Sequence, residues 1–322
     1  MIEFAKKDFK NQKIPESSGV FIFSDSRKNL YIGKASNLKK TLDILLTKKL
    51  ENKIIFKMIS LTKTSSYEKT STLFDALVKE KICLNKEIPE FNQQIIPYED
   101  YVYLGIDFNR VPYFNITENT QSNLYYIGPF RDRFFLFDLI DTFGTVFNFP
   151  ACEDENYPCI RLKEKKCFGW CVEENRKIQK IIRESYLQPN EKLLNKIKKK
   201  QEKLFDNLQF EKAEILKKQK EKILKFYDFL KLFHVTKNLN TIFSENETTY
   251  EIKNGMLLKI IKDGKQTYFP EFNIEYRDNE YLAHEKNQYA ERRIIFQYLK
   301  KNKLEKINEI FKKSILKINE RI

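Results

Sequence analysis

Four of the five cysteines lie within twenty residues of one another, and no other part of the sequence concentrates a reactive residue type so strongly. They are Cys152, Cys159, Cys167 and Cys171, separated by six, seven and three residues. Clustered thiolates are typical of zinc sites and iron–sulfur clusters. The spacing differs from the paired two-residue arrangement of zinc ribbons, and structural disulfides are the alternative explanation. The pattern predicts a metal or cluster site here.

An acidic residue interrupts an apolar helix face predicted between residues 71 and 86. The face consists of Leu73, Leu77, Glu80 and Leu84. An ionised carboxylate is costly to bury unless it is paired with a cation or bound to a metal. Glu80 is therefore a candidate metal ligand, and the alternative is a salt-bridged side chain at the edge of the apolar face.

A tyrosine, a glycine and a lysine lie together near the start of the chain, at Tyr31, Gly33 and Lys34. They are either ordinary residues of a hairpin or part of a site that cleaves a phosphodiester. The surrounding residues 17–33 alternate as half-buried strands do, and the polar stretch SDSRKN supplies a turn between two strands. Ser36 or Asn37 can cap the helix that follows. We therefore expect a hairpin followed by a helix.

The remaining chain alternates between strand and helix patterns, which predicts an α+β protein. We expect strands and one helix over 98–150, helices to about 185, a charged helical hairpin over 190–232, strands over 248–270 and helix from about 285. The regions expected are a small sheet domain with flanking helices (1–96), a cysteine-rich α/β middle region (97–188), a helical hairpin (189–232) and a small α+β C-terminal region (233–322).

The charge balance indicates a polyanionic partner. The chain has 59 Lys and Arg against 45 Asp and Glu, a formal net charge of +14. Such an excess favours nucleic acid, because each neutralised phosphate releases counterions, and a lysine-rich composition bias is the alternative. The N-terminus lacks the apolar stretch of a signal peptide, and no run reaches the roughly 20 apolar residues that span a bilayer. We therefore expect a cytoplasmic protein with no membrane partner.

The first ninety residues resemble the GIY-YIG nuclease family. GVF at 19–21 corresponds to the first half of the family motif and YIG at 31–33 to the second. YIGKASNLKK is especially similar to the N-terminal domain of the bacterial UvrC excinuclease family. The likeness continues through YYIGPFRDRFFLFDLIDTFGTVFNFPAC into the four-cysteine segment, and LFDNLQFEKAEILKKQKEKI resembles the helical hairpin called UVR. The resemblance covers roughly residues 15–230.

The resemblance implies roles for individual residues. Tyr31 would help to deprotonate the attacking water, Lys34 is the basic residue after the motif, and Asn92 closes the unit. Glu80 would hold a divalent ion, Mg²⁺ or Mn²⁺, which suits hard oxygen ligands. Three residues depart from the family pattern. The first motif tyrosine is Phe21, the arginine expected in the first helix is Thr41, and a further tyrosine expected one turn later is Leu45.

The resemblance also implies cofactors and partners beyond this domain. The four cysteines would hold a [4Fe–4S] cluster, with zinc as the alternative. Residues 195–231 would pair with a similar hairpin of a UvrB-like protein, and intramolecular packing is the alternative. The RNase H-like domain of the family is expected to be absent, since residues 232–322 contain only two aspartates, Asp263 and Asp278. His284 and Glu291 are expected on a solvated helix face.

Two functions remain open from the sequence. The first is a nucleotide excision repair nuclease that incises DNA near a lesion with a GIY-YIG site. The second is a catalytically weakened adaptor that binds DNA and docks a UvrB-like partner. Retention of Glu80 favours the first function, while Phe21 and Thr41 favour the second.

Overall fold

The computed structural model describes residues 1–47, 52–95, 98–108, 113–120, 123–147, 160–164, 176–245, 247–269 and 282–319. Helices and sheets are mixed through these residues, which confirms the predicted α+β class. The chain forms two compact units. Unit 1 comprises Met1–Glu99, Leu239–Phe272 and Ala290–Leu304, and unit 2 comprises the rest. The division into four regions stays a prediction.

Unit 1 begins with a four-stranded antiparallel sheet. Its strands are β1 (Ile2–Ala5), β2 (Gly19–Ser24), β3 (Asn29–Ala35) and β4 (Thr64–Lys69), in the spatial order β1-β4-β2-β3. The predicted hairpin is therefore β2–β3, and β3 is an edge strand of this sheet. A 3₁₀ turn, η1 (Lys6–Asn11), follows β1.

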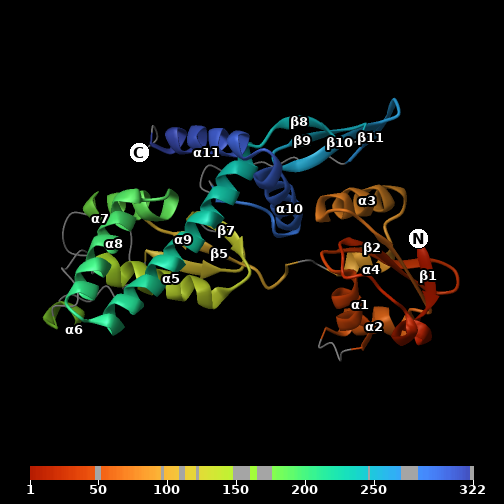
Figure 1. Ribbon diagram of the computed structural model, residues 1–322, viewed down its shortest axis with the longest axis horizontal. Coiled ribbons are helices and arrows are strands. Elements are labelled where there is room, and N and C mark those ends of the chain that lie inside the picture. The colour runs from red at the N-terminus through yellow and green to blue at the C-terminus, as the bar shows by residue number, and fades with distance from the viewer. Residues whose placement is uncertain are drawn as a thin grey trace. The chain divides into compact units, whose positions relative to one another are not determined.

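Helices cover both faces of this sheet (Figure 1). On one face Phe21 and Phe23 pack with Leu38 and Leu42 of α1 (Leu38–Thr47). The same cluster includes side chains of α2 (Lys53–Leu61) and α4 (Glu90–Gln94). On the other face Val20 packs with Ala76 of α3 (Leu73–Lys86). The alternation of residues 20–23 thus divides the strand between two cores.

Polar side chains fix where the two long helices of this domain begin. The Asn37 side chain accepts a hydrogen bond of 2.9 Å from the Lys40 backbone N–H, so Asn37 caps α1. Thr72 caps α3, and its hydroxyl accepts a bond of 3.0 Å from the Asp75 backbone N–H. The Asp75 carboxylate in turn accepts 3.0 Å and 2.9 Å bonds from the Thr72 N–H and hydroxyl, which completes a capping box.

A second antiparallel sheet in unit 1 has the order β11-β10-β9-β8. Its strands are β8 (Thr241–Glu245), β9 (Thr248–Lys253), β10 (Met256–Lys262) and β11 (Lys265–Tyr268). Asn254 and Gly255 turn β9 into β10 with φ of 48° and 73°. Asp263 and Gly264 turn β10 into β11 with φ of 51° and 71°, as expected for Asn-Gly and Asp-Gly hairpins.

An aromatic cluster joins the second sheet to α3 within unit 1. Phe74 of α3 stacks on Tyr298 with ring centroids 4.5 Å apart, and meets Phe243 at 5.9 Å and Tyr250 at 5.2 Å. Tyr298 belongs to α10 (Lys286–Asn302), while Phe243 and Tyr250 belong to β8 and β9. Helix α3 is therefore buried on two sides, by the first sheet and by this cluster.

Unit 2 contains a third sheet with the order β12-β7-β5-β6. Its strands are β5 (Val102–Ile106), β6 (Phe114–Thr117), β7 (Tyr125–Phe130) and β12 (Leu282–Ala283). Its helices are α5 (Arg133–Phe147), α6 (Ile160–Lys163), α7 (Arg176–Ile182), the π-helical turn η2 (Arg183–Leu187), α8 (Glu191–Asp206), α9 (Phe210–Asn238) and α11 (Leu304–Asn319). Helices α8 and α9 pack together across the turn at Asn207–Gln209. The four clustered cysteines lie outside the described residues.

A buried histidine ties α9 to α11 in unit 2. His234 Nε2 lies 2.8 Å from the Leu187 carbonyl oxygen, which can only accept, so Nε2 carries the proton. His234 Nδ1 therefore accepts from the Ser314 hydroxyl at 2.9 Å. Burial lowers the pKa of His234 from 6.5 to about 4, so the ring is neutral near neutral pH.

No helix among the described residues is long and apolar enough to cross a membrane.

Acidification should destabilise unit 2 through His234. Because the folded-state pKa is about 4 and the ordinary value is 6.5, the unfolded chain takes up the proton first as the pH falls. Stability present at pH 7 is lost between about pH 6.5 and 4, at most about 3 kcal/mol at 1.36 kcal/mol per pKa unit. Urea unfolding followed by circular dichroism would measure the free energy of unfolding of the wild type and of His234→Gln at each pH. The glutamine cannot titrate, so the difference between the two proteins reports the histidine. A difference that stays constant from pH 7 to 4 would contradict the assignment.

Candidate functional site

The edge strand β3 presents the candidate residues Tyr31, Gly33 and Lys34. Successive side chains of a strand point to opposite faces, so Tyr31 and Lys34 leave β3 on different sides of the sheet. Tyr31 packs partly buried against the cluster on the α1 face, with its ring centroid 6.0 Å from that of Phe21. Lys34 faces α3. The site is therefore arranged around the edge of the sheet.

Gly33 is required by the aromatic rings that cover it. A Cβ atom at this position would lie 2.6 Å from the Phe21 ring and 2.7 Å from the Tyr31 ring. Both distances are shorter than any ordinary carbon contact, and both rings belong to the packed core cluster. Glycine lets the two rings approach the backbone of β3, which fixes Tyr31 against Phe21.

Lys34 and Glu80 form an ion pair between β3 and α3. Lys34 Nζ lies 2.6 Å from Glu80 Oε2, and the Glu80 side chain is only 11% exposed. Burial raises the pKa of Glu80, while the charge and hydrogen bond of Lys34 oppose that shift. The predicted acid on the apolar face of α3 is thus buried, and the partner that compensates its charge comes from the YIGK stretch.

The phenol of Tyr31 is in an environment that disfavours its ionised form. Burial raises the pKa of Tyr31 to about 12, and the negative charge of Glu80 and then Tyr98 add to the shift. The phenol is therefore protonated near neutral pH. Positive charge added near the phenol would oppose the part of this shift that the charge of Glu80 causes.

Asn92 holds the outer edge of β3. Its Oδ1 accepts a hydrogen bond of 2.8 Å from the Ile32 N–H, and its Nδ2 donates one of 2.8 Å to the Ile32 carbonyl. One side-chain amide thus replaces the neighbouring strand that an edge lacks. Because Ile32 lies between Tyr31 and Gly33, Asn92 can position the motif through the backbone.

The three departures from the family pattern lie on the α1 side of the sheet, where Leu45 packs partly buried against the core cluster. Phe21 is 2% exposed in the core and offers a ring without a hydroxyl. Thr41 is half-buried on α1, one residue before the buried Leu42. The adjacent Lys40 is exposed, and Lys39 pairs with Glu16 at 2.7 Å. The cation of Lys39 is thus engaged away from Glu80 and does not replace the expected guanidinium.

A second ion pair lies beside Glu80, and the sequence analysis missed it. Lys81 Nζ lies 2.8 Å from both carboxylate oxygens of Glu291, and the Leu257 N–H donates to Glu291 Oε1 at 2.7 Å. The partners are separated by 210 residues, so no local pattern joins them. The charges of Glu291 and Lys81 act on the pKa of Glu80 in opposite directions.

The expectation that His284 and Glu291 lie on a solvated helix face was wrong. The Glu291 side chain is 12% exposed because it faces α3 and β10 within unit 1. His284 is 3% exposed and follows β12, where Tyr103 donates a 2.9 Å bond to its carbonyl. Long-range packing covers both positions.

The carboxylate of Glu80 could bind a hard divalent ion that keeps most of its water ligands. Mg²⁺ is usually bound through one or two carboxylates and keeps several waters. Glu80 supplies one such carboxylate, already compensated by a cation. Within the described ranges there is no group of three or more His, Cys, Asp or Glu that could hold a metal. The described residues therefore suit Mg²⁺ or Mn²⁺ at Glu80 better than a closed zinc site.

Comparison with known proteins identifies the first domain. A family model described as the UvrC-like GIY-YIG domain matches residues 17–93. UvrABC system protein C of Fervidobacterium nodosum is 29% identical over 173 residues, 52% of this chain and 30% of the relative. UvrABC system protein C of Rickettsia canadensis is 28% identical over 214 residues, which are 62% of this chain and 33% of the relative. UvrABC system protein C of Methanococcus maripaludis is 24% identical over 291 residues, which are 82% of this chain and 53% of the relative. The chain thus spans about a third to a half of the length of these relatives.

Solved structures of the N-terminal GIY-YIG endonuclease domain of UvrC from Thermotoga maritima also match. A point mutant bound to its catalytic divalent cation is 26% identical, covering 26% of this chain and 90% of that one, with a TM-score of 0.24. The form bound to magnesium is 24% identical and covers 27% of this chain and 93% of its own, with a TM-score of 0.24. The sequence resemblance to a UvrC-like GIY-YIG protein is confirmed, on the family match and the curated relatives.

Asn92→Ala should loosen the motif strand. The Ile32 N–H loses its acceptor in a partly buried place, which costs about 1–3 kcal/mol. Hydrogen exchange of the Ile32 amide would accelerate by roughly 5- to 150-fold, at 1.4 kcal/mol per factor of ten. Asn92→Asp keeps the acceptor and should retain most of the protection. Unchanged exchange in Asn92→Ala would show that the amide does not hold β3.

Proposed function

We propose that this chain, whose residues 17–93 are a UvrC-like GIY-YIG domain, is a DNA repair protein that cleaves a phosphodiester near a lesion with divalent-metal help. The observation that carries the proposal is the pairing of Lys34 with a buried Glu80 beside Tyr31. Burial of a carboxylate is costly even when a cation pairs with it. Its presence at the position that corresponds to the family's metal ligand supports a retained site.

Each residue has a separate task in the proposed reaction. Glu80 would hold the ion through its carboxylate, and Lys34 would remain near as a second cation for the phosphate. A divalent ion there would supply positive charge to the phosphate oxygens and to the attacking water. Tyr31 would first lose its phenol proton to solvent, helped by the positive charge of a bound ion. The phenolate would then take the proton of the attacking water as the water oxygen bonds to phosphorus and the bond to the leaving oxygen breaks, and solvent would protonate the leaving oxygen. Asn92 would position the motif strand rather than touch the substrate.

A second candidate function is an adaptor with weakened chemistry, and Thr41 is the observation that favours it. The arginine that the family resemblance predicts here would stabilise charge in the transition state. Removal of one such group commonly costs about 100- to 1000-fold in rate. Lys34 is a cation in direct contact with Glu80, but it is engaged by that carboxylate at 2.6 Å. The two functions therefore differ in rate, and share DNA binding.

Two substitutions should move activity in opposite directions. Glu80→Gln removes the ion-binding charge and should reduce nicking of lesion-containing duplex DNA by at least about 100-fold in Mg²⁺ or Mn²⁺. Thr41→Arg restores a guanidinium and should raise nicking by about 100-fold. Thr41→Met, of similar length without charge, is the matched control. The assay is run with and without a UvrB-like protein.

The outcome separates the two functions. Nicking that is lost in Glu80→Gln and gained in Thr41→Arg supports the nuclease. If neither the wild type nor Thr41→Arg nicks DNA, and both still bind it, the nuclease proposal is refuted and the adaptor function is supported.

The hairpin of α8 and α9 is the proposed surface for a UvrB-like partner, through residues 195–231. Its tip exposes apolar side chains, with Phe205 61%, Leu208 75% and Phe210 51% exposed. The rings of Phe205 and Phe210 meet edge to face at 5.1 Å, so they form one small apolar surface. An exposed aromatic pair of this kind is typical of the centre of an interface.

Substitution at this tip should weaken binding to the partner. Phe205→Ser with Phe210→Ser should reduce affinity for a UvrB-like C-terminal hairpin by at least about 30-fold, the effect of losing roughly 2 kcal/mol. Phe134→Ser with Phe137→Ser, which removes two rings exposed at 80% and 52% on α5 and outside residues 195–231, is the matched control. Isothermal calorimetry would measure both. Equal affinities for the two variants would place the partner elsewhere.

We further propose that Cys152, Cys159, Cys167 and Cys171 hold a [4Fe–4S] cluster, with zinc as the alternative. Support comes from the number and clustering of the thiols and from the likeness of the flanking sequence to UvrC. The iron and zinc content of the purified protein distinguishes the two.

A further inference from the structure

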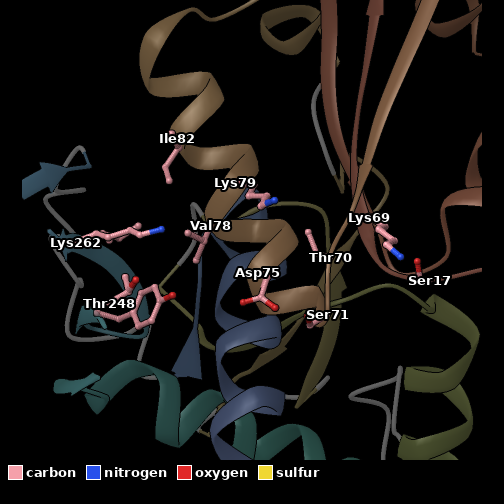
Figure 2. A pocket seen from close by; sticks show the side chains of 12 residues that line it. Ser17, Lys69, Thr70, Ser71, Asp75, Val78, Lys79, Ile82, Thr248 and Lys262 are labelled. Carbon is pink, nitrogen blue, oxygen red and sulfur yellow. The ribbon is translucent and has the colours of Figure 1, made fainter. Parts of the chain in front are cut away.

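A pocket of about 610 Å³ opens within unit 1 between α3 and the second sheet, apart from the Lys34–Glu80 pair. Figure 2 shows Lys262 reaching from β10 toward α3, with Lys69 and Ser17 at the opposite end. Its volume lies inside the range of roughly 300–1,000 Å³ typical of ligand sites. The pocket is larger than a single phosphate ion requires.

The charges around the pocket favour an anion. The side chains of Lys69 and Lys262 are exposed, and neither ammonium group takes part in an ion pair or hydrogen bond among the described residues. Lys79 also lines the pocket, and it pairs with Glu68. The acidic residue of the lining, Asp75, is occupied by the backbone and hydroxyl of Thr72 in the capping box. Two unpaired ammonium groups of the described chain therefore face a cavity whose carboxylate is already engaged.

The neutral lining favours a sugar–phosphate backbone over a base. The Ser17 hydroxyl oxygen is buried without a hydrogen-bond partner among the described residues, so it can bind an acceptor or donor entering the pocket. Val78 and Ile260 supply an apolar surface. The aromatic ring here, Tyr250, packs against Phe74 at 5.2 Å and is 9% exposed. In the described lining, no aromatic face is left open for a base to stack on.

We propose that this pocket binds the phosphate backbone of a single DNA strand, independently of base sequence. The inference rests on the proposed role in DNA repair and adds a second anchoring site to it. Helix α3 carries both sites, since Asp75, Val78 and Lys79 line the pocket and Glu80 pairs with Lys34. A strand anchored here would therefore be held at a fixed offset from Glu80, and that offset would help to set the cut position.

The test measures binding of the full chain to a fluorescent single-stranded oligodeoxynucleotide of mixed sequence, by anisotropy in EDTA. Lys69→Ala with Lys262→Ala should weaken binding at least about 10-fold, and the slope of log affinity against log salt should become shallower by about 1.4, since each lost single-strand phosphate contact contributes about 0.7. A second base sequence should bind equally. The matched control is Lys53→Ala with Lys57→Ala, which removes two exposed charges from α2.

Three outcomes would overturn the proposal. An equal loss in both double variants would mean that only the overall charge matters. An unchanged slope in the pocket variant would place the strand elsewhere. Displacement of the oligonucleotide by inorganic phosphate or dAMP at equal phosphate concentration would identify a site for a small anion.

The nicking assay keeps this inference separable from the proposed function. Loss of strand binding in the pocket variant, when neither the wild type nor Thr41→Arg nicks DNA, would support the pocket and refute the nuclease. If the pocket variant still nicks DNA at the same position and binds the strand as tightly as the wild type, the nuclease is supported and the pocket proposal is refuted.

Discussion

The burial of one carboxylate organises the first domain. Glu80 sits on the inner face of α3, where a charge is tolerated only because the Lys34 ammonium lies 2.6 Å away. This contact joins the helix to the edge strand that carries the YIG residues. The same carboxylate also acts on Tyr31, whose pKa it helps to raise. Helix register, strand placement and the ionisation of the phenol thus depend on a single pair.

Helix α3 is also the structural link between the first and second sheets. Its outer side carries Phe74, which is 2% exposed because rings from β8, β9 and α10 surround it. Lys81 adds a polar contact on the same side through Glu291. A segment that begins only at Leu239 therefore completes the environment of this helix. The capping box at Thr72 fixes the start of the helix through local contacts alone.

The sequence predicted those features that local patterns determine. Alternation predicted β2 and β3, the apolar face predicted α3 and singled out Glu80, and strands were expected over 248–270, where β9, β10 and β11 lie. Strand β4 was missed because its sequence, TSSYEK, has little apolar character, although Ser65 and Tyr67 are buried. The Lys34 partner of Glu80 and the two bonds of Asn92 were also out of reach. Each depends on residues brought together by the fold from 46 and 60 positions away.

The amide of Asn92 has a consequence for how this domain meets other chains. An open strand edge is a template on which a further strand, from another molecule, can add. By bonding both backbone groups of Ile32, Asn92 closes the outer side of β3 at the centre of the motif. If the chain binds DNA as proposed, several copies would lie close together on one molecule of nucleic acid. A closed edge would keep such copies from pairing sheet to sheet at the strand that carries Tyr31.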